Sequence, residues 1–183
     1  IRGCIVALSC GIGQELKNVV FSSDMPSRLK YQIENLEWQQ FELLAFKCLR
    51  IDISPSLIYL DGGHDKGRDF LFEGVTDYFG KSSAARSYLF QAKHKSKLTD
   101  YTTLKRDFLA ELKKVYLING LEYQEYCLVT NLPLTGDEYD GLVSEFNEFK
   151  SRNKLGYPEQ FRLYSYRQFE ACLDDHLLLR TSF

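Results

Sequence analysis

The sequence has little excess charge and no long apolar run. Its 23 Lys and Arg residues and 25 Asp and Glu residues give a net charge of −2. The chain is therefore not a polybasic nucleic-acid binder, and any nucleic-acid surface has to be a local patch. No apolar stretch approaches the length of a membrane span, and the short one near Ile1 makes a poor signal peptide. We expect a cytoplasmic protein.

Cysteine and histidine occur without metal-binding spacing. The five cysteines form no CxxC pair and the three histidines are scattered, so a zinc site is not expected. Buried free thiols in a reducing compartment are the simpler interpretation. The sequence also lacks a P-loop, a GxGxxG after a strand and a nucleophile elbow, which disfavours the common nucleotide-binding and hydrolase sites.

The 183 residues suffice for one domain with a hydrophobic core. Helical periodicity puts Trp38, Phe41, Ala45 and Cys48 on one face of the first helix. Elements are expected in this order: a helix at 36–50, strands at 56–60, 68–74 and 87–93, a helix at 101–118, a strand at 125–130, a helix at 137–150, a strand at 161–165 and a helix at 166–178.

This order predicts the fold class. Three successive strands favour an antiparallel meander, and the later strand–helix–strand steps favour parallel crossovers. The sequence therefore predicts an α/β domain over residues 36–183, with a mixed central sheet flanked by helices. Residues 1–35 are interpreted as an N-terminal extension of unknown role.

The most informative motif lies at residues 61–93. A glycine-rich turn, DGGHDKGRD, leads into one apolar strand, and the strand YLFQAK follows. Gln91 and Lys93 are two residues apart, so their side chains share one face of that strand. With Asp69 at the start of the preceding strand, this set suits metal-dependent phosphodiester cleavage. The acid would hold a divalent cation, the amide oxygen would complete its shell, and the lysine would activate water.

These motifs together resemble the restriction-endonuclease-like, or PD-(D/E)xK, nuclease superfamily, and within it the Mrr-like branch. The resemblance covers roughly 36–180 and rests on Glu42 in WQQFELLAF, Asp69 in GGHDKGRDF, and QAK, where Gln91 replaces the usual acid. It implies a restriction-endonuclease-like core and a catalytic role for Lys93.

The resemblance also implies a Mg²⁺ or Mn²⁺ cofactor. Asp69, Gln91 and the backbone carbonyl of Ala92 would hold the ion, and Glu42 would support a water or a second ion. The implied activity is that of an endonuclease on double-stranded DNA. Such domains occur as effectors of larger bacterial restriction or anti-phage proteins, including antiviral STAND NTPases, so further domains of the same polypeptide and self-association are expected.

Basic residues near these motifs are candidates for phosphate contact. Lys66 and Arg68 lie in the glycine-rich turn, and Lys95 and Lys97 belong to the run KHKSK. A charge run is equally a solvated surface.

Each site residue also has an ordinary interpretation. Asp69 could be a turn acid, Lys93 a solvated lysine at a strand end, Gln91 a strand residue bonded to its neighbours, and Glu42 the partner of a structural arginine. The alternative function is a non-catalytic module on the same fold that binds nucleic acid or a protein.

Overall fold

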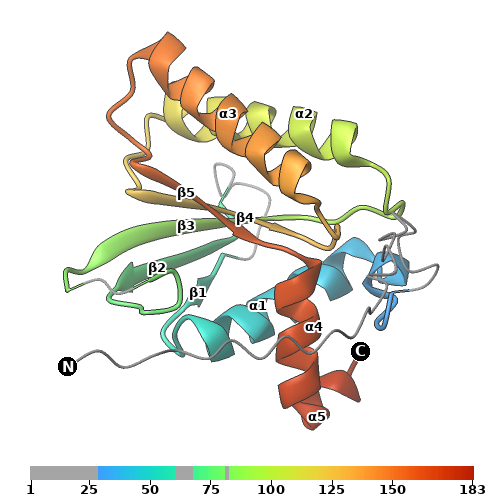
Figure 1. Ribbon diagram of the computed structural model, residues 1–183. Coiled ribbons are helices and arrows are strands. Elements are labelled where there is room, and N and C mark those ends of the chain that lie inside the picture. Colours follow the sequence, from blue (N-terminus) through green and yellow to red (C-terminus); the bar gives the residue numbers. More distant parts are fainter. Residues whose placement is uncertain (1–28, 61–67, 81–82) are drawn as a thin grey trace, which may run out of the picture.

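The computed structural model describes residues 29–60, 68–80 and 83–183. They form an α/β fold in which a five-stranded mixed sheet lies between two layers of helices (Figure 1). In chain order the elements are the 3₁₀ turn η1 (Ile33–Asn35), α1 (Trp38–Asp52), β1 (Ile58–Tyr59), β2 (Phe70–Gly74), β3 (Arg86–Lys93), α2 (Tyr101–Leu112), the π-helical segment η2 (Lys113–Ile118), β4 (Glu125–Thr130), α3 (Gly136–Asn153), β5 (Gln160–Tyr164), α4 (Tyr166–Asp175) and α5 (Leu177–Arg180).

The strands of the sheet lie in the order β1-β2-β3-β4-β5. β1, β2 and β3 form an antiparallel meander, in which Phe70 is opposite Phe90. β3, β4 and β5 are parallel, with Gln91 opposite Leu128, and helices connect them. The predicted α/β class, the meander and the parallel crossovers are confirmed.

Alternate residues of each strand face different helices because side chains alternate across a sheet. Tyr88 and Phe90 of β3 belong to a core cluster with α1 and α4, whereas Leu89 belongs to a second cluster with α2 and α3. Below, these two sides are called the α1 face and the α2 face. Figure 1 shows α1, α4 and α5 on one side of the sheet, and α2 and α3 on the other.

The apolar face of α1 differs at one position from the predicted stripe. Phe41, Ala45 and Cys48 are buried, as predicted. The prediction is wrong for Trp38, which is 59% exposed. Trp38 is the first residue of α1 and follows the N-cap Glu37, so it lies at the very end of the helix.

The described part of the N-terminal extension packs against the domain. Ile33 is buried in the core of the α1 face, and the backbone N–H of Tyr31 donates to the Tyr166 hydroxyl at 2.8 Å. Lys30 forms an ion pair with Asp174 of α4, with 2.5 Å between Nζ and Oδ1.

Two helices end differently from the prediction. The helix expected over 101–118 becomes π-helical from Lys113, and the helix expected over 166–178 breaks at His176. The backbone of His176 has φ −124° and ψ 84°, outside the helical region. In the part of the chain that the structure describes, no helix is both long and apolar enough to cross a membrane. Cys48, Cys127 and Cys172 are buried free thiols, as expected.

Candidate functional site

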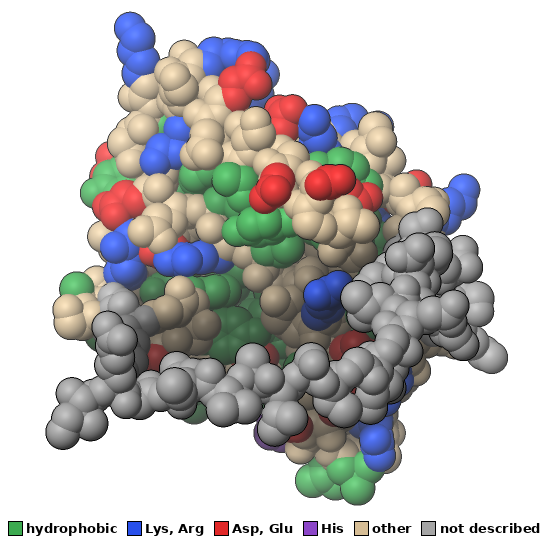
Figure 2. Space-filling view, in the orientation of Figure 1, with side chains coloured by type: hydrophobic (Ala, Val, Ile, Leu, Met, Phe, Trp, Pro, Cys, Tyr) green, Lys and Arg blue, Asp and Glu red, His purple; other side chains and the backbone are tan. Residues whose placement is uncertain are grey.

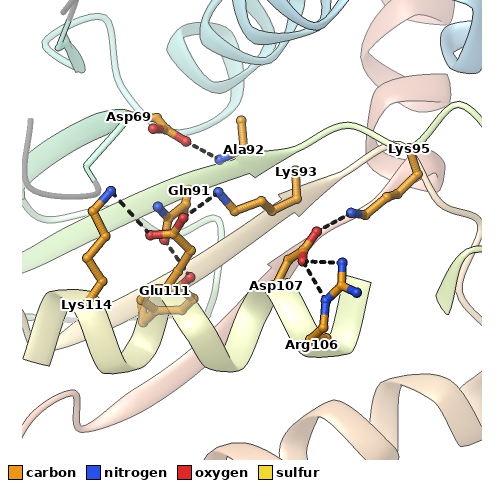
Figure 3. A network of polar contacts seen from close by, with 10 residues as sticks. Asp69, Gln91, Ala92, Lys93, Lys95, Arg106, Asp107, Glu111 and Lys114 are labelled. Carbon is orange, nitrogen blue, oxygen red and sulfur yellow. Dashed lines mark hydrogen bonds and ion pairs between the residues drawn. The ribbon is translucent and has the colours of Figure 1, made fainter. Parts of the chain in front are cut away.

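The candidate site lies where β2 begins and β3 ends. The Asp69 carboxylate accepts a hydrogen bond from the backbone N–H of Ala92, with 2.6 Å between Oδ2 and N (Figure 3). The carbonyl of Asp69 accepts from the N–H of Leu60 at 2.9 Å. Asp69 is therefore fixed between β1 and β3, beside the segment that carries QAK.

Gln91 and Lys93 project together on the α2 face, as their spacing predicts. Gln91 is 1% exposed, and its Oε1 accepts from the Tyr126 hydroxyl at 2.8 Å. Burial raises the pKa of Tyr126 well above its ordinary value, and the negative charges of Glu111 and Asp69 raise it further. The phenol therefore stays protonated and acts as a donor to Gln91.

Lys93 meets an acid that the sequence analysis did not identify. Its Nζ donates to Oε1 of Glu111 on α2 at 3.1 Å, and Nζ of Lys114 lies 3.8 Å from Oε2 of the same carboxylate. Oε2 is buried, and the described residues offer it no hydrogen-bond donor. Figure 3 shows Glu111 reaching from α2 toward β3, between the two lysines.

A second ion pair lies one helical turn earlier. Nζ of Lys95 is 2.5 Å from Oδ2 of Asp107, and the Lys95 side chain is only 9% exposed. Burial acts to raise the pKa of Asp107, but the hydrogen bond and charge of Lys95, with a smaller effect of Arg106, lower the pKa below its ordinary value. Phosphate contact by Lys95 would therefore require this pair to break.

Two residues at the end of β4 hold the backbone after QAK. The Thr130 hydroxyl donates to the carbonyl of Lys93 at 3.0 Å. The Asn131 side chain accepts from the N–H of Lys95 and donates to its carbonyl, both at 2.7 Å. These bonds fix the backbone at Lys93 and Lys95, where the chain leaves β3.

The remaining predicted site residues are Glu42 on α1 and the candidate phosphate contacts, one of which lies outside the described residues. Glu42 is buried on α1, on the opposite face of the sheet from Gln91 and Lys93. Its helix passes beside both strand ends, because the Phe41 ring lies 5.2 Å from His94 and the Phe46 ring lies 5.8 Å from Phe70.

Among the predicted phosphate contacts, the half-buried Arg68 donates to the Tyr123 hydroxyl at 3.3 Å, and Lys97 is exposed. Lys66 lies outside the described residues.

The donor set at this site is made of hard oxygens. Within residues 29–60, 68–80 and 83–183, no group of three or more His, Cys, Asp or Glu side chains could hold a metal ion. A cation here would depend on fewer carboxylates, with neutral oxygens and water completing its shell. Mg²⁺ binds in this way, since it keeps several waters and uses one or two carboxylates.

Comparison with protein-family models, with curated proteins and with solved structures found no match to this chain.

Proposed function

We propose that the chain is a metal-dependent DNA endonuclease of the Mrr-like branch, with a restriction-endonuclease-like core. One observation carries the proposal: the Asp69 carboxylate is bonded to the Ala92 amide, directly between Gln91 and Lys93. The antiparallel pairing of β2 and β3 thus brings together an acid, an amide and a lysine, a set that suits metal-dependent hydrolysis of a phosphodiester.

The proposed cation site consists of Asp69, the carbonyl of Ala92 and Oε1 of Gln91. Oδ2 of Asp69 is engaged by the Ala92 N–H, and Oε1 of Gln91 accepts one hydrogen bond from Tyr126. Carboxylate, carbonyl and amide oxygens are the hard ligands that suit Mg²⁺ and Mn²⁺. A bound Mg²⁺ or Mn²⁺ would polarise the phosphate and lower the pKa of a coordinated water. Glu42 would approach from the α1 face and hold a water or a second ion.

Lys93 is proposed to orient the attacking water and stabilise the charge that develops on the phosphate. Its ammonium is a compact, rotatable donor, and the bond from Thr130 to its carbonyl fixes its backbone. A preorganised charge of this kind acts without reorganisation during the reaction.

Double-stranded DNA is the proposed substrate, with Arg68, Lys66 and Lys97 as phosphate contacts and Lys95 only if its ion pair opens. Figure 2 shows basic and acidic side chains interspersed over the upper part of the molecule, where α3 lies. With a net charge of −2, general attraction for DNA is weak. This supports the proposal that further domains of the same polypeptide, or self-association, assist binding in a larger bacterial defence protein.

Cleavage of supercoiled plasmid in Mg²⁺ or Mn²⁺ tests the function. Asp69→Ala should abolish metal-dependent cleavage, and Lys93→Ala should slow it at least ~100-fold with the fold retained, the scale for losing one preorganised group. Asp77→Ala and Lys113→Ala are matched controls, since both residues are exposed. Wild-type rates for Asp69→Ala or Lys93→Ala would contradict the proposal.

One observation favours the alternative, a non-catalytic binding module. Lys93 is already paired with Glu111, and Gln91 with Tyr126, so both side chains have structural partners. If the wild-type chain binds duplex DNA but never cleaves it in either metal, the binding module is the correct function.

A further inference from the structure

The proposed cation site is short of negative charge. Of the three residues proposed to hold the cation, Asp69, Gln91 and Ala92, only Asp69 supplies a negative charge. One monodentate carboxylate with neutral oxygens holds a divalent cation weakly, because affinity rises with the charge of the ligands. A second acid on the same side of the sheet as Gln91 would correct the deficit.

Glu111 has the required position. It extends from α2 toward Gln91 and Lys93. The Tyr126 hydroxyl donates to Gln91, and the negative charges of Glu111 and Asp69 both raise the pKa of that hydroxyl. Glu111 therefore lies on the same face of the sheet as Gln91 and Lys93.

Glu111 also has an oxygen that accepts no hydrogen bond from the described residues. Oε1 accepts from Lys93 at 3.1 Å, whereas the buried Oε2 has only a long ion-pair contact, 3.8 Å from Nζ of Lys114. A buried carboxylate oxygen with no donor is costly unless something compensates it. A cation would do so.

Asp107, one turn earlier on α2, provides a comparison within the molecule. Its Oδ2 accepts from Lys95 at 2.5 Å, and its Oδ1 accepts from Nη2 of Arg106 at 3.2 Å. Both oxygens are satisfied, as in a structural ion pair. Glu111 differs, because its Oε2 accepts no hydrogen bond from the described residues.

We infer that Glu111 is the second carboxylate of the divalent cation site and supplies the charge that Gln91 does not. This inference rests on the proposed function. Glu111 would help to hold the ion, and a Glu111 carboxylate engaged in this way would leave the Lys93 ammonium available to the attacking water. Without a cation, the Lys93–Glu111 pair holds the lysine away from chemistry.

Titration of the 183-residue chain with Mn²⁺, followed by calorimetry and by the electron paramagnetic resonance of the free ion, tests this assignment. Glu111→Gln should weaken Mn²⁺ binding roughly 10- to 100-fold, the scale for losing a ligand or its support. Asp107→Asn, the matched control, should leave Mn²⁺ affinity unchanged. Circular dichroism checks that each variant is folded.

The decisive variant is Glu111→Gln combined with Gln91→Glu. It moves the second carboxylate from the helix to the strand, so it should recover most of the lost Mn²⁺ affinity. A carboxylate that served only as the structural partner of Lys93 would cause no loss of Mn²⁺ affinity in Glu111→Gln, and the double variant would then bind Mn²⁺ more tightly than the wild type. Wild-type affinity in Glu111→Gln, or failure of the double variant to recover it, would overturn the inference.

The binding result and the cleavage result separate the two proposals. If Glu111→Gln loses Mn²⁺ and the double variant regains it, but the wild-type chain cuts no DNA, the cation site stands and the nuclease function fails. If the wild-type chain cuts DNA and Glu111→Gln binds Mn²⁺ normally, the nuclease function stands and the assignment of Glu111 to the cation site fails. A wild-type chain that binds no Mn²⁺ overturns both.

Discussion

At the residue scale, the Lys95–Asp107 pair gives a pH-dependent contribution to stability. The pKa of Asp107 is lowered in the folded state, so the folded state binds its proton less readily than the unfolded chain does. The contribution is complete above the unfolded pKa of about 3.9 and is lost as the pH falls through the lower folded pKa.

Asp107→Asn should therefore lower the free energy of unfolding near pH 7 by about 1–2 kcal/mol, between surface and buried ion pairs. Urea unfolding at several pH values measures this difference. It should shrink as the pH falls below about 4, because the wild-type acid then becomes neutral too. A difference that stays constant down to pH 2 would mean that the ion pair is not its source.

The sequence indicated some site residues and missed another for a physical reason. Asp69, Gln91 and Lys93 are joined by local strand spacing and a hairpin, so the motif alone predicted that they meet. Glu111 reaches Lys93 only because α2 folds back over β3, and no local pattern reports that crossing. A weak signal existed in the spacing of the charges: Asp107 and Glu111 are four apart on a predicted helix, and Lys93 and Lys95 are two apart at the end of a predicted strand.

At the element scale, the end of α3 has a strained residue. Lys154 is the C-cap with φ 52° and ψ 42°, a left-handed conformation that glycine adopts without steric cost. Lys154→Gly should raise the free energy of unfolding by about 0.5–1 kcal/mol. A glycine placed inside the helix, by Ser151→Gly, should instead lower the free energy of unfolding by about 0.5–1 kcal/mol. Equal effects of the two in chemical denaturation would contradict this account.

Element predictions succeeded where one local signal was strong. β4 was predicted at 125–130 and found at Glu125–Thr130, because an apolar run between polar segments leaves few alternatives. The π-helical segment η2 was missed because its burial of Val115 and Tyr116 continues the helical pattern. Trp38 continues the apolar period but is the first residue of α1, and periodicity does not encode how far burial extends along a helix.

At the scale of the whole molecule, two cores share one sheet. Leu128 of β4 is fully buried in the core of the α2 face, and the next residue, Val129, is buried in that of the α1 face. A defect on one face should therefore destabilise both helix layers, because the sheet couples them into one cooperative unit.

Leu128→Ala should cost about 2–5 kcal/mol, the range for a leucine truncated in a core. Hydrogen exchange followed by mass spectrometry should show faster exchange in α1 as well as in α2. Ile118→Ala, at a residue that is 69% exposed, is the control and should change neither the free energy of unfolding nor the exchange rates. Faster exchange confined to α2 and α3 would show that the two layers unfold separately.

The order of the strands bears on how the chain is built during synthesis. Each strand pairs with the one that precedes it in the sequence, so no strand has to be inserted between two that are already paired. A chain that emerges from the ribosome N-terminus first can add β2 to β1, then β3, β4 and β5, always at the same growing edge. The Asp69–Ala92 contact is complete once β3 has joined, whereas Glu111 arrives with the following helix. Nascent chains therefore assemble the two strand motifs before they acquire the acid that pairs with Lys93.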